Sequence, residues 1–519
     1  MDKRHIIKTT SGLFLVLAFS RLMGFFREML IAYRFGSGVE TDAFFVAIGI
    51  QSVIYSLFAS GLSVAIVPVV SDIRQKKDLS DADSYVSGLL NLFFILSLAM
   101  IAFGFAFTKE IVKVFALGFE GEQLKIAVSI TRIGLSVITF QAISAILMAY
   151  NHCLGKFVLP SLESIFFNLP ILAYLAVFYG NWGIQGLMVS FVVGYILRVL
   201  VAYGSLSGHW RYSSVMTGQG DNFRKTFKIM GPILIGSMAG QINHIVDKTL
   251  ASRLVAGSIS ALTYAGRTKQ IVSSLFLASL VTVVYPKISD YLAWDEKKKL
   301  QATMTYSINL ILLIVIPALT GLIILNRSII QTLFFRGAFT ERNVFMTSSA
   351  LVFYSIGLAG SGMSLLVNKV YFAMNDSFTP MKMGFLTVAL NIILNLLLVG
   401  PMGHNGLALA TSIAGTFSAT LLFWGLRKKK ISVEYRRISK VFLKATFSSI
   451  IMGVVVFLLS NNFVEIAKGE ASWQFVKLIA VCGIGAIVYG LLLYIFKVEE
   501  VREIVDKSMT FILTVIRRK

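Results

Sequence analysis

The chain has 519 residues, of which 56% are hydrophobic and only 14% carry a charge. Soluble globular proteins have about 25% charged residues, so the composition excludes a soluble enzyme or binding domain and indicates a membrane protein. The formal net charge of +22 suits either a nucleic acid or a membrane surface as a partner, and its distribution along the chain must decide between them.

The N-terminal segment has basic residues at Lys3, Arg4 and Lys8 and then an apolar run, which is also the pattern of a signal peptide. The apolar run continues past Arg21 to Phe35 without a small-residue cleavage site. We therefore expect a retained first membrane helix.

Apolar windows of about 20 residues, the length that crosses a hydrocarbon core, recur along the whole chain. They predict an all-α polytopic membrane protein with about fourteen transmembrane helices. The predicted spans are 11–35, 43–70, 85–107, 126–150, 157–180, 183–206, 228–252, 258–286, 305–326, 343–373, 380–400, 403–426, 439–460 and 474–496. The segments 107–125 and 498–519 are predicted to be helices that lie in the membrane interface.

Lys and Arg gather in alternate connections between these spans. The basic connections are 74–77, 211–225, 297–299 and 427–437. The opposite connections are short or nearly neutral, with 327–343 as a mild exception. Because basic loops stay cytoplasmic, we expect both termini on the cytoplasmic side. Much of the positive charge then determines topology, and a nucleic-acid partner is not expected.

The two halves of the chain resemble each other. The segment 56–72 matches 274–290 at an offset of 218, including Pro68, and 183–187 matches 403–407 at an offset of 220. The offset covers an even number of predicted helices, so the repeats have the same orientation in the membrane.

The repeat predicts three parts of the chain. Residues 1–215 form an N-terminal six-helix lobe, 216–430 form a C-terminal six-helix lobe, and 431–519 add two helices and the amphipathic tail. This is the plan of a transporter that binds its substrate between two lobes and works by alternating access.

Charges inside the predicted spans indicate a substrate pathway, because an Arg at mid-membrane costs about 2.5–3.5 kcal/mol on insertion scales. The first helix carries Arg21, Arg27 and Glu28. Arg21 and Glu28 share a helix face, so a structural ion pair between them is the alternative. Arg27 and Glu28 are expected to point in different directions, with one of them meeting another helix. Arg34 is near the helix end and is expected to snorkel.

Further charges follow in later spans. The seventh predicted helix has His244, Asp247 and Lys248, and the eighth has Arg267 and Lys269. Other in-span charges are Arg132, Glu163, Arg198 and Lys369.

Charged residues near the ends or the start of a predicted helix also have a simple structural interpretation. Arg132 and Arg198 are expected to snorkel from positions near helix ends. Asp42 opens the second helix, where a role as its N-cap explains it as well as a functional role does.

Basic residues outnumber acidic ones in the first halves of both predicted lobes, which favours an anionic substrate. Arg suits phosphate because its planar guanidinium donates two parallel hydrogen bonds. An exporter of cations would need acidic residues along its first helix instead.

Catalytic constellations in the sequence are weak. It has no Walker A motif, GxSxG or HExxH, so we expect neither an enzyme nor an ATP-driven pump, and no cofactor or metal. Cys153 and Cys482 lack the spacing of a disulfide or zinc site and are expected to act as small apolar side chains.

Four segments carry a family resemblance. They are 19–28 with its Ser-Arg-Leu-Met-Gly-Phe-Phe-Arg-Glu run, 36–47 with Thr-Asp-Ala-Phe-Phe, Val67-Pro68, and 264–267. Together these segments resemble the MurJ (MviN) lipid II flippases. These belong to the multidrug/oligosaccharidyl-lipid/polysaccharide (MOP) exporter superfamily. The resemblance covers essentially the whole chain, and the first-helix motif is fairly specific.

The resemblance implies a flippase of the bacterial cytoplasmic membrane for lipid II, an undecaprenyl-pyrophosphate-linked peptidoglycan precursor. It implies that Arg21, Arg27, Asp42 and Arg267 bind the head group in a central cavity, with Glu28 where the family usually has Asp. The partners it implies are the lipid-linked anionic glycan, membrane lipids and ions for coupling.

The second helix departs from the family pattern. The family usually has an arginine pair and then Ala-Glu-Gly there, where this chain has Tyr55-Ser56 and Ala59-Ser60-Gly61. The alternatives are therefore a flippase for another polyprenyl-linked glycan, of capsule, teichuronic acid or O-antigen type, and a membrane protein of cell-wall assembly that transports nothing.

Overall fold

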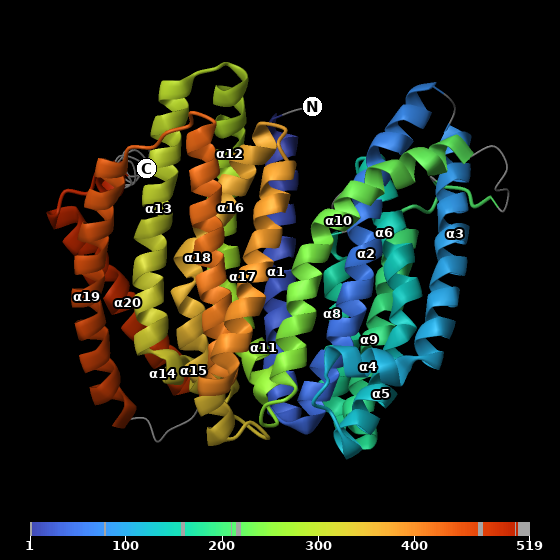
Figure 1. Ribbon diagram of the computed structural model, residues 1–519, viewed down its shortest axis with the longest axis horizontal. Coiled ribbons are helices and arrows are strands. Elements are labelled where there is room, and N and C mark those ends of the chain that lie inside the picture. Colours follow the sequence, from blue (N-terminus) through green and yellow to red (C-terminus); the bar gives the residue numbers. More distant parts are fainter. Residues whose placement is uncertain are drawn as a thin grey trace. The chain divides into compact units, whose positions relative to one another are not determined.

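The computed structural model describes residues 3–76, 79–156, 161–208, 210–213, 220–465, 471–503, 505 and 506. Helices make up most of these ranges, and none of them contains a strand (Figure 1). The predicted all-α class is therefore confirmed. The end of the predicted amphipathic tail, from residue 507 onward, lies outside the described residues.

The chain packs as two compact units. The first comprises Met1–Ser260 and Arg336–Thr340, and the second comprises Ala261–Phe335 and Glu341–Lys519. Packing thus assigns α10 (Gly220–Ala251) to the first unit. The predicted lobes 1–215 and 216–430 and the extra part 431–519 follow the sequence repeat rather than packing, and they stay a prediction.

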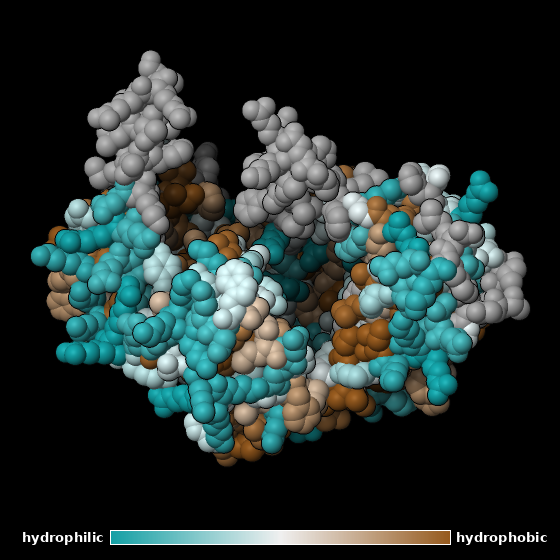
Figure 2. All heavy atoms as spheres, turned by 90° about the horizontal axis from the view of Figure 1, so that it is seen from above, coloured by the Kyte–Doolittle hydropathy of each residue, from teal (hydrophilic) through white to brown (hydrophobic). Residues whose placement is uncertain are grey.

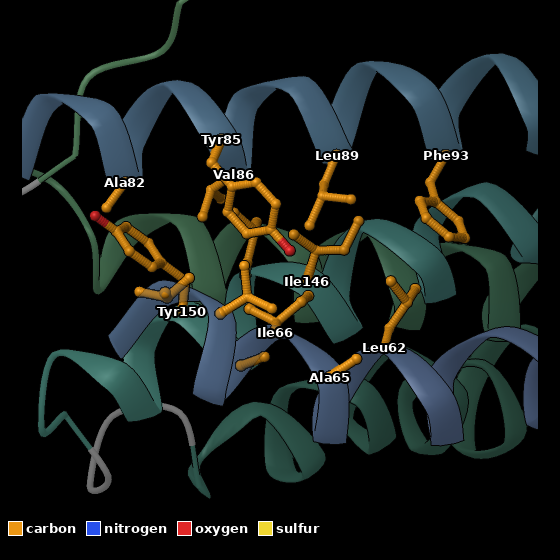
Figure 3. Packing of buried hydrophobic residues seen from close by; sticks show 14 of the residues in the cluster. Leu62, Ala65, Ile66, Ala82, Tyr85, Val86, Leu89, Phe93, Ile146 and Tyr150 are labelled. Carbon is orange, nitrogen blue, oxygen red and sulfur yellow. The ribbon is translucent and has the colours of Figure 1, made fainter. Parts of the chain in front are cut away.

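The first unit is built around α2. Its other helices, with α10, are α1 (Lys3–Phe35), α3 (Leu79–Ala106), α4 (Thr108–Phe115), α5 (Gly121–Leu135), α6 (Val137–Cys153), α8 (Glu163–Ala173), the π-helix η1 (Tyr174–Phe178) and α9 (Tyr179–Gly204). The helix α2 (Val39–Lys76) packs along α5, α6 and α10. Figure 3 shows its Leu62 and Ile66 against Val86 and Leu89 of α3 and Ile146 of α6, and all five side chains are buried.

The second unit contains the remaining helices. They are α11 (Ser258–Val272, whose first three residues belong to the first unit), the π-helix η2 (Ser273–Leu277), α12 (Ala278–Ala293), α13 (Lys297–Ile324), α14 (Asn326–Phe334), α15 (Glu341–Ile356), α16 (Leu358–Ala373), α17 (Phe378–Met402), α18 (His404–Lys428), α19 (Tyr435–Glu465) and α20 (Ala471–Ile495). α18 packs against α15, α16 and α17, and α19 packs against α13 and α20. Leu443, Ile450 and Ile487 of the last two helices are exposed, as expected of helices that face lipid.

Ten helical segments of the described residues are long and apolar enough to cross a membrane, or eleven if α15 and α16, bent by 46°, form one span. One of the ten, Glu163–Gly204, contains parts of two predicted spans. The backbone leaves the helical conformation at Gly183, the first residue of the second of these spans, with φ 52° and ψ −141°. The predicted count of fourteen spans stays a prediction.

The repeated Gly-x-x-Gly-Leu segments have the same backbone turn in both units. Gly403 has φ 58° and ψ −135°, which nearly equals the conformation of Gly183. Only glycine adopts this region without strain. The sequence match at an offset of 220 is therefore also a match in local structure.

Hydrophilic side chains gather at helix ends, as the space-filling view in Figure 2 shows. At the end of α2, Asp72 forms ion pairs with Lys225 at 2.6 Å and Lys76 at 2.9 Å. The hydrogen bonds from Lys225 and then Lys76 lower the pKa of Asp72 to about 2, so this carboxylate stays ionised at neutral pH.

The core of the first unit gives a stability prediction. Ile146→Ala should lower the free energy of unfolding by about 2–5 kcal/mol, because it leaves a cavity in a closely packed cluster. Ile95→Ala is the matched control, since this α3 side chain is 61% exposed whereas Ile146 is fully buried. Thermal unfolding of both variants in detergent measures the difference, and equal midpoints would contradict the packing described here.

Candidate functional site

The first helix buries one of its arginines against another helix. The Arg27 Nη2 atom lies 2.8 Å from Glu28 Oε1, and Nη1 donates to Asn168 Oδ1 of α8 at 3.1 Å. The two charged side chains are 15% and 6% exposed. The expectation that Arg27 and Glu28 point apart is wrong, because the long Arg side chain bends back to its neighbour. The expectation that one of them meets another helix is confirmed.

A second buried ion pair joins α8 and α9. The Arg198 Nη2 atom lies 2.5 Å from Glu163 Oε1, and the Ser144 hydroxyl of α6 donates to Glu163 Oε2 at 3.3 Å. The side chains of Arg198 and Glu163 are 22% and 11% exposed. The expectation that Arg198 snorkels is therefore wrong. The missed signal was that both residues lie within about two turns of the same end of consecutive predicted spans.

Aromatic rings lie between the two guanidinium groups. Arg27 packs over the ring of Phe167, 5.7 Å from its centroid, and Arg198 packs over the ring of Tyr195 at 5.9 Å. The centroids of Phe167 and Tyr195 are 4.7 Å apart. Phe191 also contacts Arg27, at 5.2 Å. Each guanidinium thus has a carboxylate on one side and a ring face on another, an arrangement that favours Arg over Lys.

The second helix contributes no cation to this region. No charged residue occurs in α2 between Asp42 and Asp72. Ser56 donates its hydroxyl to the backbone oxygen of Val53 at 2.8 Å. The side chains of 59 and 60 lie outside the described residues.

Asp42 does cap a helix, but not its own. Its carboxylate accepts hydrogen bonds from the backbone of Gly257 at 2.7 Å and from the backbone and hydroxyl of Ser260 at 2.7 and 2.6 Å. These donors belong to the first turn of α11 and the residue before it. The Ser37 hydroxyl lies 2.8 Å from that of Ser260. Asp42 is 2% exposed, so its carboxylate holds the start of α11 in the way an N-cap does.

The remaining predicted site residues are exposed. Arg21 is exposed on α1. Arg267 is exposed on α11 in the second unit, where its Nη1 donates to Gln270 Oε1 at 3.3 Å. The first unit therefore brings Arg27 and Glu28 together, whereas Asp42 lies at the start of α11. Their joint role as a binding site stays a prediction.

Two other in-span cations bind backbone oxygens. Arg34 donates to Leu175 O at 2.9 Å and Ala176 O at 3.2 Å, both in the π-helix η1. Lys248 of α10 donates to Phe45 O of α2. These contacts tie helices together inside the first unit, and Arg34 makes specific contacts instead of only snorkelling.

Within the described part of the chain, no three His, Cys, Asp or Glu side chains are placed to hold a metal ion.

Arg132 is exposed, and its guanidinium lies over the Phe105 ring, 4.9 Å from the ring centroid.

The fold is one that solved membrane transporters share. The structure resembles an inward-facing multidrug resistance MATE family transporter of the MOP superfamily with a TM-score of 0.67, covering 81% of this chain and 95% of that chain at 13% identity. A family model described as lipid II flippase MurJ matches residues 31–476. The chain therefore belongs to the MurJ family.

Individual relatives agree with this assignment. The chain is 27% identical to a probable lipid II flippase MurJ of Buchnera aphidicola subsp. Baizongia pistaciae, over 92% of this chain and 94% of that protein. It is 29% identical to the lipid II flippase MurJ of Thermosipho africanus, over 93% and 95%. A solved lipid II flippase MurJ in an inward closed conformation matches with a TM-score of 0.80 and 28% identity, covering 93% of this chain and 98% of that chain.

The hydrogen bonds of Asp42 give a second prediction. Asp42→Ala should lower the thermal unfolding midpoint by several degrees, because it removes acceptors for three buried donors. Asp42→Asn should have a smaller effect, since it keeps one acceptor oxygen. Glu40→Ala is the control, because Glu40 is exposed in the same helical turn. An Asp42→Ala midpoint equal to that of Glu40→Ala would refute the capping role.

Proposed function

We propose that this protein flips lipid II across the bacterial cytoplasmic membrane by alternating access, without covalent chemistry. The match to the MurJ family model over residues 31–476 carries the proposal. The similarity to a solved lipid II flippase over nearly the whole chain supports it. The buried Arg27 fits an anionic head group, because a guanidinium is suited to phosphate.

The proposed binding residues divide into two roles. Arg21, Arg27 and Arg267 contact the pyrophosphate and sugar head group, and Glu28 orients Arg27 through their 2.8 Å ion pair. Asp42 acts as a positioning residue, since its carboxylate is already engaged by Gly257 and Ser260.

The proposed setting is the cytoplasmic membrane, with both termini on the cytoplasmic side. The basic connections 74–77, 211–225, 297–299 and 427–437 support this orientation. Membrane lipids surround the protein, and ions accompany transport as coupling partners.

A flippase for another polyprenyl-linked glycan is the second candidate. The charge-free stretch of α2 around Tyr55 and Ser56 favours it, because a different set of cavity side chains suits a different head group.

Complementation distinguishes the two candidates. Expression of this chain should restore growth to bacteria depleted of their own lipid II flippase. Rescue of a glycan-export mutant instead, with no rescue of the depleted strain, would select the second candidate. Rescue of neither strain, with normal membrane levels, would contradict both.

The binding role gives a further prediction. Arg27→Ala and Arg267→Ala should abolish complementation while the membrane levels stay normal, because each removes a proposed phosphate contact. Arg327→Ala is the control, since this residue forms an exposed ion pair with Glu341 at 3.0 Å and should keep activity. Full complementation by both cavity variants would refute the anion-cavity role.

A further inference from the structure

Arg27 and Arg198 are held in the same way. Each guanidinium gives its Nη2 atom to a carboxylate, Glu28 in one case and Glu163 in the other. In each, the buried Nε atom has no hydrogen-bond partner among the described residues. A buried donor left without an acceptor is costly and needs an explanation. The parallel suggests that both groups are held ready for a ligand with further acceptor oxygens.

The two arginines lie at different levels along α8. Arg27 binds Asn168, and Arg198 binds Glu163. Asn168 follows Glu163 by five residues, which is about 7–8 Å along a helix at 1.5 Å per residue. Glu163 begins α8, at the end of the helix that the predicted topology places toward the cytoplasm. Arg198 is therefore the more cytoplasmic of the two cations.

The Arg198 side chain is also partly exposed. Its exposed fraction of 22% is larger than the 15% of Arg27. A guanidinium has five N–H donors, so the bond to Glu163 leaves donors for phosphate oxygens. The neighbouring stretch of α2 supplies no competing cation, since Tyr55 and Ser56 are uncharged.

We propose that Arg198 is a second phosphate-binding residue, which the lipid-linked pyrophosphate contacts on the cytoplasmic side of Arg27, and that Glu163 is its positioning residue. This inference rests on the proposed function. The head group would pass from Arg198 to Arg27 along the aromatic pair of Phe167 and Tyr195. Weak contacts at successive levels favour movement, because no single site then holds the substrate too tightly.

A purely structural ion pair is the competing explanation. An ion pair that only holds α8 and α9 together needs opposite charges on the two helices. It does not matter for this role which helix carries the cation. The double exchange Glu163→Arg with Arg198→Glu keeps the pair and moves the cation to α8. Phosphate binding needs the cation on α9, whereas a lock does not.

The test measures binding of undecaprenyl pyrophosphate, the part shared by lipid II and other pyrophosphate-linked glycans, to the purified full-length protein in detergent. Arg198→Gln should weaken binding at least tenfold, and Arg198→Lys should weaken it less. The double exchange should restore the thermal midpoint but not binding. Glu163→Gln should weaken binding less than Arg198→Gln. Arg132→Gln is the control, because Arg132 is an exposed arginine of the same unit, and it should bind like the wild type.

Two results would overturn the inference while leaving the proposed function intact. One is wild-type binding by Arg198→Gln, and the other is wild-type binding by the double exchange. If Arg198→Gln fails to fold, the double exchange and Arg198→Lys still decide between the explanations. Absence of binding by the wild-type protein would refute this inference, whereas the complementation experiment tests the proposed function separately.

Discussion

The cost of placing a charge in an apolar environment governs the first unit. An arginine or lysine inside a membrane span is stable only with partners that replace water. Arg27 and Arg198 obtain carboxylates at 2.8 and 2.5 Å, whereas Arg34 and Lys248 obtain backbone oxygens. Arg27 also reaches Asn168 of α8, and Arg198, Arg34 and Lys248 contact groups on a second helix, so these four cations also fix the packing of helix pairs.

The π-helix η1 illustrates this coupling between charge and backbone. Backbone oxygens in a regular α-helix are already used within the helix, whereas a widened turn leaves them better exposed. Arg34 binds two oxygens of η1, those of Leu175 and Ala176. The irregular segment therefore serves as the partner of a cation from α1.

The sequence located the charged residues inside the helices, but it did not identify the groups that they contact. The apolar periodicity was enough for the all-α class, and the repeat identified Gly183 and Gly403, which share one backbone conformation. Helical geometry failed for Arg27 and Glu28 because it places Cβ atoms, while a long side chain can bend back to its neighbour. It also could not predict that Asp42 caps α11, since a contact across more than 200 positions leaves no local pattern.

Charge balance connects this structure to transport. Arg27 with Glu28 and Arg198 with Glu163 are two neutral pairs, so these four side chains together carry no net charge. A pyrophosphate bound there would add negative charge to a region of low dielectric, where uncompensated charge is costly. A cation or proton that enters with the substrate would restore neutrality. The neutrality of these ion pairs is thus the physical argument behind the ion coupling proposed above.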